Sequence, residues 1–215
     1  MITVYGFSRV NPFARGRTRD LRVLWALEEM GLPYEIKGMD HPANDLGTDA
    51  YRRMSPFEQI PAIDDDGIVL SESGAILLYL ARKSGKLIPP DKAGRAQVVR
   101  WCFAALTTVE APIQYLGILG FIAKDDPGAR RQIEFTMGWA HRHLGNLERW
   151  MEGREYVATD SFTVADILMS LVLSELDDEK LFEPYPRVRA YRDRCKARPA
   201  WKKTFEAYCA RVEAG

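Results

Sequence analysis

The segment from residue 55 to residue 79, SPFEQIPAIDDDGIVLSESGAILLY, most constrains what this chain folds into. Two short β-like runs, at 62–63 and 68–70, are separated by DDDG, and an Asp-Gly pair between such runs is a strong β-hairpin signal. The apolar residues that follow have helical spacing and predict a helix that starts between residues 71 and 73. The segment therefore reads as a hairpin that leads directly into a helix.

The start of that helix carries a carboxylate beside a hydroxyl, Glu72 and Ser73. A helix N-terminus offers unpaired backbone N–H groups and a positive dipole end, which suit a carboxylate ligand. Ser73 adds a hydroxyl donor for that anion, and Glu72 can pair with an ammonium group, so the two fit the zwitterionic end of an amino acid. The alternative is that Ser71 or Ser73 is only an N-cap and that Glu72 only complements the dipole.

The dipeptide Ile60-Pro61 enters the first strand of the hairpin. A cis proline is typical of a tight turn, and it leaves the preceding residue extended with free backbone groups. Ile60 would then pair in strand fashion with the backbone of a bound peptide. An ordinary trans proline at the start of a strand is the alternative.

The motifs SPFEQIPAI, DDDG and ESGAILLYL resemble the glutathione-binding half of the cytosolic glutathione S-transferase family. The usual form in that family reads NPxGxIPAL, then an aspartate-rich turn, then ESxAIxxYL. This chain departs from it with Ser55 in place of asparagine and with Phe57-Glu58 around the usual glycine.

The resemblance implies a role for each matching position. Ile60, before a cis Pro61, would pair with the cysteine of glutathione through its backbone, with Gln59 as a neighbour. Glu72 and Ser73 would bind the γ-glutamyl end.

Charge and composition limit the classes of partner. The chain has 215 residues, and its 30 Lys and Arg balance its 30 Asp and Glu, so the formal net charge is zero. A neutral chain gives no reason to expect nucleic acid or an anionic membrane as a partner. We expect no signal peptide, and no apolar run approaches the ~18 residues of a membrane span, so we expect a cytoplasmic protein.

The three cysteines, Cys102, Cys195 and Cys209, are widely spaced and form no C-x-x-C motif. His141 and His143 lie two residues apart on an expected helix and therefore on different faces. We expect neither a metal site nor a disulfide framework.

The order of expected elements predicts two domains. A strand at 2–7, a helix near 19–30 and a strand at 34–37 precede the hairpin and its helix, which is a thioredoxin-like α/β order. The segment 84–91 is rich in turn residues and reads as a linker. We therefore expect an α/β domain at 1–83, the linker at 84–91 and an all-helical domain at 92–215.

Several signals mark helices in the second half. A long helix is expected near 129–151, and Thr163 to Asp166 has capping-box spacing. Pro186 and Pro199 sit where two last helices would begin. The first helix after the linker is expected to carry an apolar stripe, formed by Val99, Cys102, Phe103, Leu106 and Val109. The α/β domain followed by an all-helical domain is the architecture of the family, so the resemblance covers the whole chain, and it implies a homodimer.

If glutathione binds, its thiol lies near the start of the first helix, where an enzyme must favour the thiolate. No cysteine precedes Cys102, which excludes family branches that use a protein thiol. Thr18, four residues before Arg22, matches the hydroxyl of serine-type members and is also a natural N-cap. Tyr5 ends the expected first strand, as in tyrosine-type members, and Ser8 directly follows it.

The loop between the first strand and the first helix is rich in arginine, with Arg9, Arg15, Arg17 and Arg19. Arg17 or Arg19 would lower the thiol pKa or hold the glycyl carboxylate, whereas the alternative is a solvated surface loop. Our preferred activating group is Thr18 with Arg17, followed by Tyr5 and then Ser8.

We expect the second substrate to lie against the first helix of the helical half. The candidate wall residues are Phe13, Trp101, Ala105, Thr108 and Tyr115.

The leading interpretation is a detoxifying glutathione transferase, in which the thiolate of glutathione attacks a small hydrophobic electrophile. One alternative is glutathione-dependent disulfide or peroxide reduction, which needs no protein cysteine if two glutathiones bind. The other is a non-catalytic glutathione-binding module of the same fold.

Overall fold

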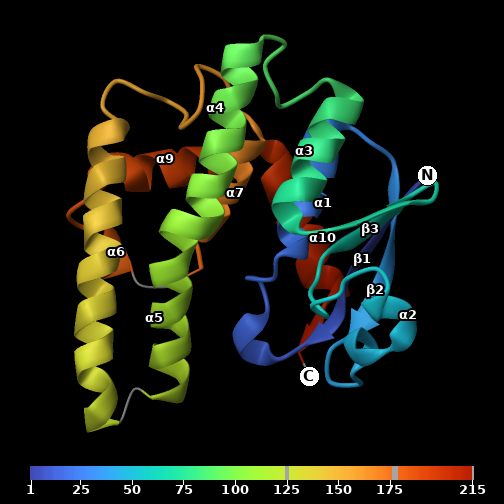
Figure 1. The fold of residues 1–215 in the computed structure, drawn as a ribbon, viewed down its shortest axis with the longest axis horizontal. Helices are drawn as coiled ribbons and strands as arrows, with labels where there is room; N and C mark the ends of the chain where they lie inside the picture. Colours follow the sequence, from blue (N-terminus) through green and yellow to red (C-terminus); the bar gives the residue numbers. More distant parts are fainter. Residues whose placement is uncertain (124–125, 176–178, 215) are drawn as a thin grey trace. The chain divides into compact units, whose positions relative to one another are not determined.

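A computed structural model describes residues 1–123, 126–175 and 179–214 (Figure 1). Contacts divide the chain into two compact units. The first unit comprises Met1–Leu87 and Ala197–Gly215, and the second unit comprises Ile88–Lys196.

The first unit is built on a mixed β-sheet with the order β2-β1-β3-β4. β1 is parallel to β2 and antiparallel to β3, and β3 and β4 form the expected hairpin. A short fifth strand, β5, pairs with the end of β1. The strand bounds are β1 Ile2–Val10, β2 Tyr34–Asp40, β3 Ala62–Asp65, β4 Ile68–Ser71 and β5 Glu213–Ala214.

Three helices cover one side of this sheet (Figure 1). α1 packs beside α3, and the last helix, α10, packs against α1. α1 ends at Gly31, which adopts the left-handed conformation with φ 66° that favours glycine. The helices of the first unit are α1 Asp20–Met30, α2 Asp49–Arg52, α3 Ser73–Ser84 and α10 Pro199–Arg211, with 3₁₀ turns at Pro12–Ala14 and Asp45–Gly47.

The described part of the second unit is helical. α4 continues through a π-helical turn, Ala104–Val109, into α5, and α5 packs against α6. The helices are α4 Lys92–Phe103, α5 Glu110–Ile122, α6 Arg130–Trp150, α7 Val164–Val172, α8 Glu179–Phe182 and α9 Pro186–Lys196, with a 3₁₀ turn at Pro127–Ala129.

The capping box expected at the start of α7 is confirmed. The Asp166 carboxylate accepts from the Thr163 backbone N–H at 2.8 Å and from the Thr163 hydroxyl at 2.9 Å. It also accepts from the Val157 backbone N–H and the Tyr191 hydroxyl, each at 3.0 Å. Asp166 is fully buried, so one carboxylate organises three segments of the second unit. The helix starts expected at Pro186 and Pro199 are also confirmed.

The first strand is longer than its sequence predicts. The prediction ended it at residue 7, but β1 continues to Val10, because Arg9 and Val10 pair with the distant residues Glu213 and Ala214. Tyr5 is therefore in the middle of β1 rather than at its end, and Ser8 lies within the strand rather than after it.

The last helix also differs from the expected division of the chain. The sequence places it in a helical domain at 92–215, whereas its contacts group it with the first unit. Trp201 packs on Trp25 with ring centroids 5.0 Å apart, and Arg198 pairs with Glu29 at 2.6 Å. These contacts span more than 160 residues of sequence, so no local pattern announces them.

The apolar stripe expected along α4 is partly wrong. Cys102 and Val109 are buried, but Phe103 is 61% exposed, and Val98 and Ala105 take the buried positions instead. The buried residues Val98, Cys102, Ala105 and Val109 keep ordinary helical spacing, so the buried stripe lies on a neighbouring face of the helix, and the π-helical turn at Ala104–Val109 is not the cause.

The same turn joins α4 and α5 into one continuous helix, Lys92–Ile122. By length and composition alone, this helix could cross a membrane, which the sequence reading did not foresee. The core helix of a folded protein can have the same length and composition, and 44% of the most apolar window of this helix is buried inside the protein.

The three cysteines are free thiols, with Cys102 and Cys195 buried. Within residues 1–123, 126–175 and 179–214, no group of three His, Cys, Asp or Glu side chains is placed to hold a metal ion.

Candidate functional site

Strand register brings the two sequence motifs together at one end of the sheet. Ala62 on β3 lies opposite Ser71 on β4. Ile60-Pro61 directly precedes Ala62, and Glu72-Ser73 directly follows Ser71, so both pairs leave the hairpin at the same end. On the other side of β3, Tyr5 lies opposite Ala62.

The start of α1 is held at this same end. The first residue of α1, Asp20, accepts a hydrogen bond from the Phe7 backbone N–H at 3.1 Å, just beyond the Tyr5–Ala62 pair. The three regions that the sequence analysis singled out are therefore neighbours within the first unit, although 54 positions separate Thr18 from Glu72 along the chain.

The Ile60–Pro61 peptide bond is cis, as the resemblance implies. Ile60 and Pro61 are buried, whereas Gln59 is exposed. In the described part of the chain, no hydrogen bond is found to the backbone N–H or C=O of Ile60. Both groups remain available for an extended ligand.

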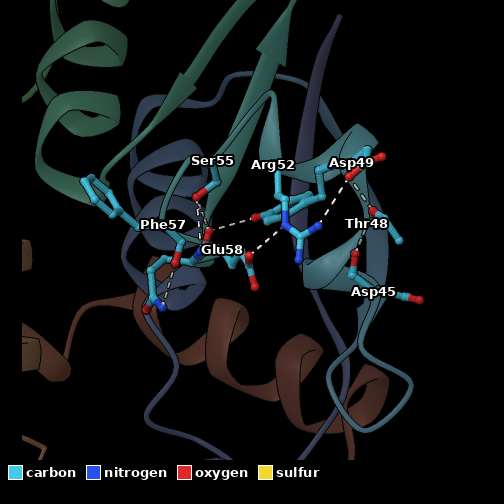
Figure 2. Close-up of polar contacts among 9 residues, drawn as sticks. Asp45, Thr48, Asp49, Arg52, Ser55, Phe57 and Glu58 are labelled. Carbon is cyan, nitrogen blue, oxygen red and sulfur yellow. Dashed lines mark hydrogen bonds and ion pairs between the residues drawn. The ribbon is translucent and has the colours of Figure 1, made fainter.

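Gln59 is fixed by the loop before it, in which Figure 2 labels Ser55. The hydroxyls of Tyr51 and Ser55 donate to the Gln59 carbonyl oxygen at 2.8 Å and 2.9 Å, and the Gln59 N–H donates back to Ser55 Oγ at 3.1 Å. Ser55, which stands where the family pattern has asparagine, is therefore a buried organiser of this loop.

Glu72 and Ser73 occupy the N-terminus of α3 in the arrangement an anion site needs. Glu72 is the N-cap residue, but no side chain caps the helix, so the interpretation of Ser73 as only a cap is wrong. Since Ser73 is the first helical residue, the N–H groups of the first turn have no acceptor within the helix.

The backbone of Glu72 is strained. Its φ is 70°, a value that non-glycine residues rarely adopt. Residues with such strained backbone conformations are found most often at functional sites. The Glu72 side chain is exposed.

A buried arginine lies beneath this helix end. Arg22, on α1, is 3% exposed and donates from Nη1 to Ser73 Oγ at 3.4 Å. The sequence does not predict this contact, since an arginine inside an amphipathic helix carries no signal of where its head group lies.

Thr18 does not cap α1. Arg19 holds the N-cap position without a side-chain bond, so the N-cap interpretation of Thr18 is wrong. The Thr18 side chain is 8% exposed and turns to the last helix, where its hydroxyl donates to the Tyr208 hydroxyl oxygen at 2.8 Å. Tyr208 Oη also accepts the Gly16 backbone N–H at 3.3 Å.

Two acidic groups behind Thr18 have raised pKa values because of burial. Burial raises the pKa of Asp20, although the charge of Arg211 and the hydrogen bond from the Phe7 backbone N–H oppose the shift. Arg211 Nη2 lies 3.6 Å from Asp20 Oδ2. Burial likewise raises the pKa of the Tyr208 phenol, against the hydrogen bond from Thr18.

The remaining candidates for the sulfur site have different surroundings. Arg17 is half-buried, with its guanidinium over the Phe13 ring at 5.4 Å. Tyr5 is half-buried, and its ring lies 6.1 Å from that of Tyr51. Ser8 lies over Gly38 on β2, where an added Cβ would come 2.7 Å from Ser8 Cβ.

The residues proposed for the second-substrate wall differ in exposure. Phe13 and Tyr115 are 48% and 45% exposed, and Thr108 is exposed, so each offers surface to a ligand. Trp101 is 8% exposed and packs on Trp150 with ring centroids 5.1 Å apart. Ala105 is fully buried and offers none.

Comparison with known proteins gives the class. The sequence profile of the glutathione S-transferase N-terminal domain matches residues 13–82, and that of the C-terminal domain matches residues 117–207. Glutathione S-transferase 1 of Triticum aestivum is 31% identical over 204 residues, which cover 85% of this chain and 87% of the relative.

Solved structures agree. A glutathione transferase family member from Pseudomonas fluorescens pf-5, with two glutathione bound, is 29% identical with a TM-score of 0.84, covering 95% of this chain and 92% of that one. A glutathione transferase from Burkholderia graminis, with two glutathione molecules bound per subunit, is 30% identical with a TM-score of 0.84, covering 96% and 88%.

Fold and site thus define a thioredoxin-like domain joined to an all-helical domain. The chain belongs to the glutathione S-transferase family, and its relatives indicate a glutathione transferase enzyme.

Proposed function

We propose that this protein binds glutathione at the end of the sheet in the first unit and promotes attack of its thiolate on a small hydrophobic electrophile. The observation that carries the proposal is the Ala62–Ser71 register, which sets Ile60-Pro61 beside Glu72-Ser73. We further propose that this is a cytoplasmic detoxification reaction.

The γ-glutamyl end of glutathione would occupy the N-terminus of α3. Its carboxylate would accept from the first-turn N–H groups and from the Ser73 hydroxyl, and its ammonium group would pair with Glu72. The buried charge of Arg22 behind Ser73 supports an anion at this point.

The cysteinyl residue would pair with the free backbone groups of Ile60, with Gln59 beside it. The sulfur would then lie toward the start of α1, near Thr18 and Arg17. There a hydroxyl donor and a nearby cation would favour the thiolate over the thiol.

In the reaction, the thiol of glutathione first gives its proton to solvent water. The thiolate sulfur then forms a bond to the electrophilic carbon, and the leaving group departs with its electron pair. Phe13, which is 48% exposed in the loop before α1, is proposed to contact the electrophile.

Isothermal titration calorimetry tests the binding step. We expect saturable heat with millimolar or submillimolar glutathione, and Ser73→Ala should weaken binding by about 1.5–3 kcal/mol, because it removes a hydrogen bond to a charged group. Absence of heat and of any thermal shift from the wild-type protein would refute the proposal. An unchanged affinity in Ser73→Ala would remove only Ser73 from the site.

A second candidate function is glutathione-dependent disulfide reduction. The relatives from Pseudomonas fluorescens and Burkholderia graminis were solved with two glutathione molecules, and a Pseudomonas putida relative with glutathione disulfide. A binding stoichiometry of two glutathiones per chain in the same titration would favour this reaction, and a stoichiometry of one would favour transfer. Binding without turnover of any electrophile or disulfide would indicate a non-catalytic module.

We also propose a homodimer. Phe57, at the tip of the loop in Figure 2, is 76% exposed, which is unusual for a large apolar side chain and suits a contact with a second copy. Light scattering at micromolar concentration is expected to give twice the chain mass of 24.5 kDa. A monomer mass would contradict this assignment.

A further inference from the structure

The loop before Ile60 contains a non-glycine residue in a left-handed conformation. Glu58 has φ 54°, a value that glycine adopts freely and that other residues adopt at a cost. Position 58 is where the family pattern NPxGxIPAL carries glycine. The chain thus keeps the turn but not the residue that makes the turn easy.

An ion pair accompanies this substitution. Arg52 donates from Nε to Glu58 Oε1 at 2.8 Å, and its Nη1 lies 3.3 Å from Asp49 Oδ1 (Figure 2). Because Asp49 and Arg52 share one turn of α2, the guanidinium is already oriented when it meets Glu58. The ion pair is thus made to the residue whose backbone conformation is disfavoured.

The direction of the Ile60 N–H depends on this turn. Glu58 leads into Gln59, whose carbonyl is held by the hydroxyls of Tyr51 and Ser55. That carbonyl shares a planar peptide unit with the Ile60 N–H, so fixing the one fixes the other. If Glu58 adopted another backbone conformation, the Gln59 carbonyl and the Ile60 N–H would both change direction.

We propose that Arg52 and Glu58 are positioning residues for glutathione binding: their ion pair maintains the left-handed turn that aims the Ile60 backbone at the cysteinyl part of the ligand. The inference rests on the proposed function. Neither side chain needs to touch glutathione. The pair acts through the fraction of molecules whose loop is competent to bind, and the apparent Kd rises as that fraction falls.

The test is calorimetric titration of glutathione into four variants of the full chain. Arg52→Met and Glu58→Ala each remove the pair but keep a Cβ at position 58, so each is expected to raise the Kd about three- to fivefold. Glu58→Gly also removes the pair but makes the turn easy, so it should bind several-fold more tightly than Glu58→Ala. The double variant Arg52→Met/Glu58→Gly should have a Kd within 1.5-fold of that of Glu58→Gly, because the ion pair is already absent in Glu58→Gly.

Salt and a neighbouring arginine provide controls. Both members of the pair are partly exposed, so salt should screen it and raise the Kd more in the wild type than in Glu58→Gly. Arg53→Met makes the same substitution at an exposed position next to Arg52, for which the described residues show no ion pair, and should leave the Kd within 1.5-fold.

Two failures are distinguishable. No binding by the wild-type protein would overturn the proposed function and this inference with it. If the wild-type protein binds glutathione, two results would overturn this inference alone. One is a Kd of Arg52→Met within 1.5-fold of the wild-type Kd. The other is an equal change in Kd when Arg52→Met is made in the wild type and in Glu58→Gly.

Discussion

Asp166→Ala is expected to lower the free energy of unfolding by about 3–5 kcal/mol, because it leaves several buried donors without an acceptor. These donors are the N–H groups of Val157 and Thr163 and the hydroxyls of Thr163 and Tyr191. The carboxylate is fully buried, so water cannot replace it in the folded state. Urea unfolding monitored by circular dichroism gives the free energy directly.

Asp160→Ala is the matched control. Asp160 lies in the same connection before α7 but is exposed, so its replacement should change stability by no more than about 0.5 kcal/mol. A loss below about 1 kcal/mol in Asp166→Ala would show that the capping box is dispensable and that packing alone holds the segments around α7.

The sequence predicts the site best where the chemistry is local. Asp-Gly between two β-like runs predicts the hairpin, and the hairpin alone requires that the residues before its first strand and after its second lie side by side. Ile60-Pro61 and Glu72-Ser73 therefore come together without any long-range information. The capping box at Thr163 is equally local, since its two side chains are three residues apart.

The parts that sequence could not predict depend on distant partners. Tyr208 contacts Thr18 across 190 residues, and Glu213 extends β1 from the far end of the chain. The sequence predicts a helix that begins at Pro199, but it does not show that Tyr208 on this helix meets Thr18. The left-handed turn at Glu58 was also invisible, because the sequence shows only that glycine is missing there and not that Arg52 compensates for it.

Thr18 has two incompatible uses for one proton. As the proposed sulfur donor, it must give its hydroxyl proton to the thiolate of glutathione. In the structure, the same hydroxyl donates to Tyr208 and lies in the buried cluster with Asp20. A hydroxyl carries a single donor, so the two uses compete, and the effect of removing Tyr208 Oη separates them.

Tyr208→Phe is expected to lower the pKa of the bound glutathione thiol if Thr18 serves the sulfur, because it releases the Thr18 proton for the thiolate while keeping the ring. Thr18→Ala should then do the opposite: it should raise that pKa and lower kcat by about 10²-fold, with little loss of binding, since Glu72 and Ser73 still hold the ligand. Thr18→Ser, which keeps the hydroxyl, should restore most of the rate. The absorbance of the thiolate against pH measures each pKa.

A different pattern would assign the sulfur to another group. If Thr18→Ala and Tyr208→Phe only lower the melting temperature, their hydrogen bond is structural, because both then remove the same buried contact and nothing else. Tyr5→Phe would in that case be the variant that raises the thiol pKa, although Tyr5 lies in the middle of β1. If all three leave the pKa unchanged, a charge rather than a hydroxyl stabilises the thiolate, and Arg17→Ala should raise the pKa, because removing a nearby cation disfavours an anion.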